Sequence, residues 1–227
     1  MNWLKLTAVA TLLMIGLCES TTQAQENTFK KPRQLWANSK LFTESPKMEF
    51  EKWLGKKPET EHKFIILEFW RTWCSACKKQ TPVFNKFQKK YADDLVIISV
   101  TGETEDDLAK YDGPKKEYYQ VIDKAQSKEA LDAADALAKA ESDNGLEDSN
   151  CNPDTSVNCK GDYIVDQQGV TEAAYGVFGW PHVVLLEPED RVVVWEGFPL
   201  QEGYELSEEK LEKYFAVYKK LLAEKKQ

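Results

Sequence analysis

The sequence has no excess of positive charge. Among its 227 residues, 30 Lys and Arg stand against 38 Asp and Glu, which gives a net charge of −8 and an isoelectric point near 5.0. A general nucleic-acid binder needs a basic face for the phosphates, so we expect no nucleic-acid partner. Lysine and glutamate are interspersed along the chain, which is typical of a solvated surface.

Long apolar runs and internal repeats are also lacking. Outside the N-terminal segment, no stretch approaches the roughly 18 apolar residues that a membrane-spanning helix needs. Disorder is excluded because 42% of the residues are hydrophobic and aromatic residues are frequent, with seven Trp, nine Tyr and ten Phe. The length fits one good-sized domain and is too short for two large ones.

The N-terminal segment, residues 1–24, is typical of a secretory signal peptide. Lys5 supplies the positive charge, Leu6 to Leu17 form an uncharged, mainly apolar run, and a Ser/Thr-containing stretch ends at Ala24. Cys18 leaves lipid anchoring open, but Leu17 is not the small residue that a lipidation motif places before its cysteine. The sequence therefore predicts an exported, periplasmic protein with no transmembrane segment in its mature chain.

Cysteine is scarce, and the mature chain keeps an even number. Cys74 and Cys77 lie three apart, directly after an apolar run, and Cys151 and Cys159 bracket a turn-rich loop. In an oxidising compartment an even number of cysteines predicts disulfide pairs.

Apolar runs around the first cysteine pair predict an α/β fold. Strands are expected at 64–70 and 95–100 with a helix at 74–91 between them, and the continuous apolar pattern indicates strands buried on both faces. Further on, 183–186 and 191–195 predict an antiparallel hairpin. A terminal helix follows Ser207, which is a good N-cap with acidic residues behind it.

The Cys74–Cys77 pair has the spacing of a dithiol–disulfide exchange site. A helix N-terminus stabilises a thiolate at the first cysteine, and the second cysteine, one turn later, can attack a mixed disulfide formed there. The alternative is half of a Cys₄ zinc site completed by Cys151 and Cys159. Their wider spacing disfavours zinc, because zinc knuckles usually pair two close-spaced units.

Two segments resemble one family. The run from Phe69 to Cys77 (FWRTWCSAC) resembles the active-site signature of the TlpA/ResA/DsbE-like exported thiol–disulfide oxidoreductases, and Tyr175 to Pro181 (YGVFGWP) resembles their approach to a cis-proline. The resemblance implies a thioredoxin-like three-layer sandwich, in which helices flank a central mixed β-sheet.

The resemblance also implies roles for individual residues. Cys74 would be the exposed nucleophile, Cys77 the resolving thiol and Pro181 the cis-proline opposite them. Trp73 and Trp180 would contact substrate, with the backbone of Trp180 free to pair with an extended segment.

Three further side chains carry expectations with alternatives. Glu68 occupies the position of the family's buried acid, where burial would suit it to proton transfer at Cys77; the alternative is a solvent-facing edge residue. Glu103 resembles an acid beside the ResA active site, or else simply begins a helix in an acidic run. His182 is expected to be a packing or surface residue rather than a metal ligand.

Two features depart from the family. Ala76 replaces a proline that many relatives carry between the cysteines, which leaves the direction of electron flow open.

The connection between the second strand and the cis-proline is also longer than in the family. We expect residues 25–60 as a lead-in that packs on the domain, 61–227 as the domain, and an inserted helical and loop segment at about 113–161. The family's next strand is then 163–165 rather than 118–122, and Cys151–Cys159 is a structural disulfide.

The resulting functional prediction is an exported enzyme that reduces the disulfides of client proteins. It would use the redox-active Cys74–Cys77 pair without any other cofactor or resident metal, and would receive electrons from a membrane donor. The alternatives are an oxidase or isomerase of protein disulfides, or a non-enzymatic module that binds Cu(I) through the same two cysteines.

Overall fold

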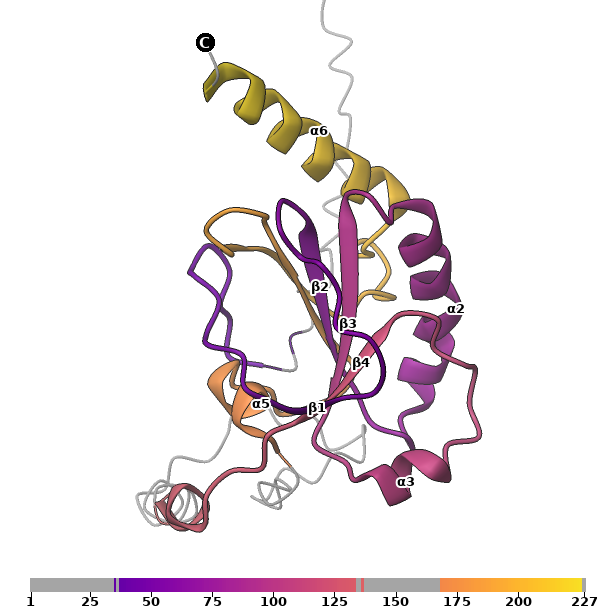
Figure 1. Cartoon of the computed structure of the whole chain (residues 1–227), viewed down its shortest axis with the longest axis vertical. Coiled ribbons are helices and arrows are strands. Elements are labelled where there is room, and N and C mark those ends of the chain that lie inside the picture. The colour runs from indigo at the N-terminus through magenta and orange to yellow at the C-terminus, as the bar shows by residue number, and fades with distance from the viewer. Residues whose placement is uncertain (1–34, 36, 134–135, 137–167, 226–227) are drawn as a thin grey trace, which may run out of the picture. The chain divides into compact units, whose positions relative to one another are not determined.

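Six strands form one mixed sheet in the order β1-β4-β3-β2-β5-β6 in the computed structural model (Figure 1). The structure describes residues 35, 37–133, 136 and 168–225. The expected signal peptide, Cys18, the Cys151–Cys159 pair and the candidate strand at 163–165 lie outside the described residues.

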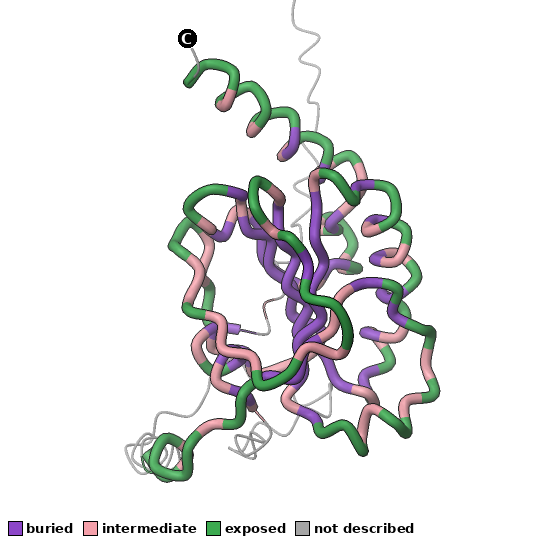
Figure 2. The backbone as a smooth tube through the Cα atoms, viewed as in Figure 1, coloured by how far each residue is buried: buried purple, intermediate pink, exposed green. Residues whose placement is uncertain are grey.

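The centre of the sheet confirms the expected buried strands. β2 (Phe64–Phe69) and β3 (Leu95–Thr101) run parallel, and every residue of both strands is buried. β5 (His182–Leu186) pairs antiparallel with β2 and forms the expected hairpin with β6 (Val193–Gly197). The burial colouring of Figure 2 shows these strands as the continuous interior of the molecule.

Helices and loops cover both faces of this sheet. α2 (Ser75–Lys90) and α6 (Glu208–Lys225) pack their aromatic residues on one face, in a cluster with Phe64 and Ile66. The other face packs against Tyr175, which follows α5 (Val170–Ala174), and against lead-in residues. As expected, Ser207 caps α6, accepting a hydrogen bond from the N–H of Lys210 at 3.2 Å. The three-layer thioredoxin-like arrangement is confirmed.

The lead-in contributes a strand that the sequence did not reveal. β1 (Phe50–Trp53) is the edge strand of the sheet and pairs antiparallel with β4 (Tyr119–Asp123). Isolated bridges join Ala37 to Val177 and Glu44 to Val192. The strand is only four residues long and its two central residues are charged and exposed. Such a pattern is too short to distinguish a strand from a loop.

The structure corrects the expected start of the insertion. β4 (Tyr119–Asp123) pairs parallel with β3, after α3 (Glu105–Ala109) has crossed from one strand to the other. Residues 119–123 therefore belong to the sheet, and the alternative strand assignment, less favoured from the sequence, is the right one. A bridge between Ala125 and Gly169 brings together the two parts of the chain that flank residues 126–168. Of this segment, residues 128–133 are helical, as expected.

Gly169 precedes α5 and allows the side chain of Asp123 to approach the start of this helix. The Asp123 carboxylate accepts hydrogen bonds from the N–H groups of Thr171 at 3.1 Å and Glu172 at 2.8 Å, at the start of α5. A Cβ on Gly169 would lie 2.2 Å from Cγ of Asp123. Only glycine lets the carboxylate come this close, so the contact fixes where α5 begins. Burial raises the pKa of Asp123 to about 6.

Candidate active site

The two cysteines lie where β2 gives way to α2. Cys74 is the N-cap of α2, and its Sγ accepts a hydrogen bond from the N–H of Cys77 at 3.1 Å. The pair is joined by a disulfide, with Cα atoms 5.2 Å apart. The first turn of α2 carries no acidic residue. In the reduced protein, the helix N-terminus and this N–H group would stabilise a Cys74 thiolate.

Cys74 is less accessible than expected. Its exposed fraction is 5% and that of Cys77 is 0%, so the expectation of an exposed nucleophile is wrong for the oxidised form. Trp70, Tyr111 and Trp180 pack around the pair. Trp73, in contrast, is 58% exposed, and its ring meets that of Trp180 edge-on with centroids 5.5 Å apart. These contacts join segments distant in sequence, so local spacing could not reveal them.

The proline predicted from the family resemblance is in the expected conformation. The Trp180–Pro181 peptide bond is cis, and Pro181 is buried directly before β5. Trp180 is half-buried and packs against the cluster of Trp70, Cys74 and Cys77. The two segments that carry the family resemblance therefore meet in space.

Glu68 is fully buried, which rules out the solvent-facing alternative. Its Oε2 accepts a hydrogen bond from Lys116 Nζ at 2.7 Å and another from the Tyr118 hydroxyl at 2.7 Å. Its Oε1 is buried and has no hydrogen-bond partner among the described residues. Lys116, itself 5% exposed, was not recognised from the sequence, where it stands in a charged run that looks like surface.

The buried Glu68 network reaches the turn that holds Cys77. Lys116 Nζ also contacts Oγ1 of Thr81 at 3.4 Å, and this hydroxyl donates to the Cys77 carbonyl at 3.1 Å. Burial lowers the pKa of Lys116, although the charge of Glu68 opposes the shift. Burial and the charge of Glu68 raise the pKa of Tyr118 well above its usual value. The network therefore places three buried titratable side chains beside the first turn of α2, which carries Cys77.

Glu103 is tied to the loop that precedes Cys74. Its carboxylate accepts hydrogen bonds from the N–H of Thr72 at 2.7 Å and the Thr72 hydroxyl at 2.6 Å, and a third from Thr101 at 3.1 Å. The helix-start alternative is wrong, because α3 begins at Glu105 with Thr104 as its cap. Glu103 lies beside the active site, as expected, but its oxygens are engaged in holding the loop.

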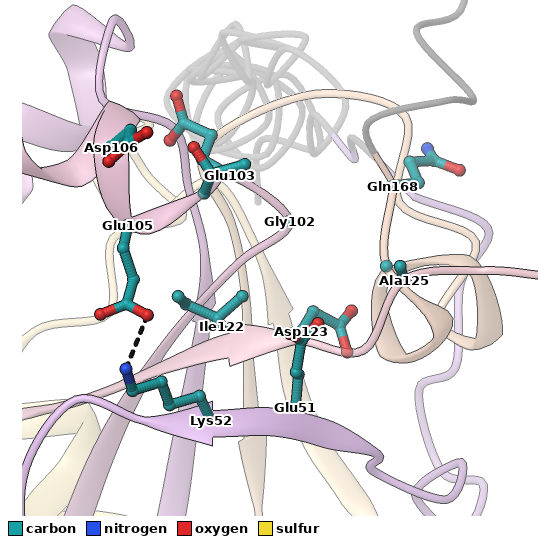
Figure 3. Close-up of a pocket in the computed structure, with 12 residues that line it drawn as sticks. Glu51, Lys52, Gly102, Glu103, Glu105, Asp106, Ile122, Asp123, Ala125 and Gln168 are labelled. Atoms are coloured by element: carbon teal, nitrogen blue, oxygen red, sulfur yellow. Dashed lines mark hydrogen bonds and ion pairs between the residues drawn. The ribbon is translucent and has the colours of Figure 1, made fainter.

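Beyond Glu103 lies a shallow pocket lined by acidic side chains (Figure 3). Glu105, Asp106 and Asp123 line it together with Glu51 of β1. Lys52 pairs with Glu105 at 2.6 Å. The pocket lies between the edge strand β1 and the residues that flank the inserted segment, Ala125 and Gly169. Cys74 and Cys77 are not among its lining residues.

His182 is a packing residue. It is 1% exposed in β5, and its ring stacks on Phe69 with centroids 6.2 Å apart. Burial lowers its pKa to about 3.

The buried His182 should make the free energy of unfolding depend on pH. The pKa of His182 is about 3 when folded and about 6.5 when unfolded. As the pH falls below 6.5, the unfolded chain takes up the proton first, so stability falls by up to about 1.4 kcal/mol per pH unit. Urea unfolding of wild type and His182→Phe at pH 7 and 5 should show a weaker acid loss in the variant. An equal loss in both would contradict the assignment.

Comparison of wild type with the variant is needed because Asp123 has the opposite effect. Its raised pKa means that the folded state binds a proton first as the pH falls through 6, which adds stability. This contribution is common to both proteins and cancels in the difference.

Known proteins match the part of the chain that carries Cys74 and Cys77. The family profile described as Thioredoxin matches residues 42–113. The Thioredoxin-like protein YneN of Bacillus subtilis is 40% identical over 42 residues, which cover 18% of this chain and 25% of that protein. The Thiol-disulfide oxidoreductase ResA of Bacillus thuringiensis is 35% identical over 80 residues, covering 30% of this chain and 46% of that protein.

Solved structures match more of the length. The thioredoxin domain of a thiol-disulfide oxidoreductase from Bacteroides vulgatus covers 68% of this chain and 81% of its own, with 20% identity and a TM-score of 0.42. The chain spans less than half the length of the curated relatives named above. Residues 42–113 therefore match the Thioredoxin family, and the segment that carries Cys74 and Cys77 is similar to thiol–disulfide oxidoreductases named ResA.

Proposed function

We propose that the protein is an exported thiol–disulfide oxidoreductase that reduces disulfides in client proteins. The observation that carries the proposal is the Cys74–Cys77 disulfide at the N-terminus of α2. The proposal agrees with the match to a ResA protein, whose name describes thiol–disulfide chemistry. The mature chain would act in the periplasm, with electrons supplied by a membrane donor.

The reaction needs only the two thiols and a proton acceptor. The Cys74 thiolate attacks one sulfur of a client disulfide; that S–S bond breaks, a mixed disulfide forms and the second client sulfur leaves as a thiolate. Cys77 then loses its proton and attacks Sγ of Cys74. The mixed disulfide breaks, the client leaves as a dithiol, and Cys74–Cys77 is oxidised by two electrons.

Glu68 is the candidate acceptor for the Cys77 proton. Its Oε1 has no partner among the described residues, and its Oε2 joins Lys116 in the network that reaches the Cys77 carbonyl through Thr81. Lys116 Nζ lies 2.7 Å from the carboxylate, and an ammonium group at this distance would limit the cost of burying it. Glu103 and Thr72 hold the preceding loop and thereby orient Cys74.

Reduction of insulin disulfides in the presence of dithiothreitol tests the activity, and the Cys74–Cys77 potential tests its direction. We expect turnover and a potential closer to thioredoxin, near −270 mV, than to a strong oxidase, near −120 mV. A potential near the oxidase value would favour an oxidase or isomerase. Stoichiometric Cu(I) retention without turnover would favour the metal-binding module.

Cys151 and Cys159, which lie outside the described residues, are proposed to form a structural disulfide. Their loop encloses seven residues, and closing such a loop removes denatured-chain entropy worth about 2–3 kcal/mol. The double variant Cys151→Ser/Cys159→Ser should melt at a lower temperature and reduce insulin at a near-normal rate. A variant that melts normally but is no longer reduced by its physiological donor would instead indicate an electron relay.

A further inference from the structure

A buried ion pair lies beside the active site and has no role in the mechanism above. Arg71 stands three residues before Cys74, and Glu172 lies in α5, about a hundred residues later. Both side chains are 0% exposed, and the guanidinium meets the carboxylate in a bidentate pair of 2.6 and 2.7 Å. The planar fork of arginine fixes the relative orientation of the two groups, which lysine would not do.

This ion pair also holds Trp180, the residue before Pro181. The indole Nε1 donates to Oε1 of Glu172 at 3.1 Å, and the guanidinium carbon of Arg71 lies 4.2 Å from the centre of the Trp180 ring. A second donor, the N–H of Gly169, reaches Oε2 of Glu172 at 3.3 Å. The indole is thus held at its face by a cation and at its edge by a carboxylate.

The same cluster links three separate segments of the chain. Arg71 donates to the Trp70 carbonyl at 2.8 Å in the loop before the cysteines. Glu172 belongs to α5, and Trp180 to the loop that ends at Pro181. A fully buried, bidentate ion pair has few alternative arrangements, because any other rotamer would leave a charge without its partner in a dry interior.

We infer that Arg71 and Glu172 are positioning residues that hold the Trp180 ring against Trp73, and that the resulting indole pair selects clients with an aromatic or large apolar side chain next to the reactive cysteine. The inference rests on the proposed function and names the substrate class for that site. Trp73 is 58% exposed, whereas Cys74 is only 5% exposed. A client segment that reaches Cys74 must therefore pass the Trp73–Trp180 pair. Stacking and burial there would favour binding of a client with an apolar side chain next to its cysteine.

Two disulfide peptides that differ only in having Phe or Ser beside the cysteine test the inference. Wild type should show a lower KM for the Phe peptide. Trp180→Phe, which keeps a ring and loses the N–H donor, and Arg71→Lys should each raise that KM about fivefold, the size of one aromatic contact. The rise should be confined to KM and should be much smaller with the Ser peptide.

The matched control is Trp53→Phe, a half-buried tryptophan of β1 that packs on Phe50 and is outside the aromatic cluster at the cysteines. Trp53→Phe should leave the KM for both peptides unchanged. Equal effects of Trp180→Phe on the two peptides, or no effect on either, would overturn the inference. Glu172→Gln leaves the Arg71 charge unpaired and can unfold the domain, so the milder variants decide.

A spectroscopic measurement separates this inference from the proposed function. If wild type reduces neither peptide, the proposed function fails, and the positioning role is then read from near-ultraviolet circular dichroism. Arg71→Lys should change the signal of the paired indoles, whereas the control Arg191→Lys, in the β5–β6 turn, should not. An unchanged signal in Arg71→Lys would overturn the positioning role even in an active enzyme.

Discussion

Replacing Cys77 with serine should convert the protein from a turnover catalyst into a trap for its clients. Cys74 would still attack a client disulfide, but no second thiol could resolve the mixed disulfide. We expect turnover to fall by more than about a thousandfold, as when a nucleophilic group is removed. Covalent complexes should accumulate and should disappear on adding dithiothreitol. Non-reducing gels and mass mapping of the joined peptides measure both.

The control for this trap is the variant Cys74→Ser. It removes the attacking thiol, so it should lose turnover to the same extent without forming complexes, because Cys77 is 0% exposed. The pattern assigns the two roles. If Cys77→Ser kept wild-type turnover, or if Cys74→Ser formed the complexes instead, the assignment would be wrong.

Replacing Lys116 with methionine should cost the domain about 3–5 kcal/mol of unfolding free energy. Methionine keeps a long, unbranched side chain at this position but removes the ammonium group, which lies 2.7 Å from the Glu68 carboxylate in the wild type. The carboxylate is then buried without a cation. The double variant Glu68→Gln/Lys116→Met removes both charges and should recover most of the loss. Urea unfolding of wild type, Lys116→Met, Glu68→Gln and the double variant measures the coupling between the two residues.

Lys90→Met is the matched control for this loss. Lys90 pairs with Glu208 and Glu212 on the surface of α2 and α6, where solvent weakens ion pairs. Its replacement should change stability little. A Lys116→Met protein as stable as the Lys90→Met protein would show that the buried pair does not stabilise the fold in the way described.

The same variants separate stability from proton transfer. Glu68→Gln retains the shape of the side chain and loses the ability to take a proton. We expect slower turnover at neutral pH and a flatter pH–rate profile at temperatures where the variant is folded. An unchanged profile would leave Glu68 with a structural role only.

The sequence by itself determined the chemistry of the site. Cys74 and Cys77 are three residues apart between an apolar strand and an amphipathic helix, and such a junction is local, so spacing alone predicts a helix N-terminus at the first thiol. β2, β3, α2 and the β5–β6 hairpin were likewise predictable, because each is a continuous apolar or periodic run. The buried position of Glu68 was implied by the family resemblance, in which an acid stands six residues before the first cysteine.

Only the tertiary structure decided which residues surround that chemistry. Lys116 meets Glu68 across 48 residues and Arg71 meets Glu172 across 101. In the sequence, Lys116 and Glu172 look like ordinary surface charges, and nothing there indicates either pairing. The same holds for β4, whose short, ambiguous segment becomes a strand because the edge of β3 offers hydrogen-bonding partners. The physical reason is that burying a charge or pairing a short strand depends on neighbours that the fold brings together, which no local pattern records.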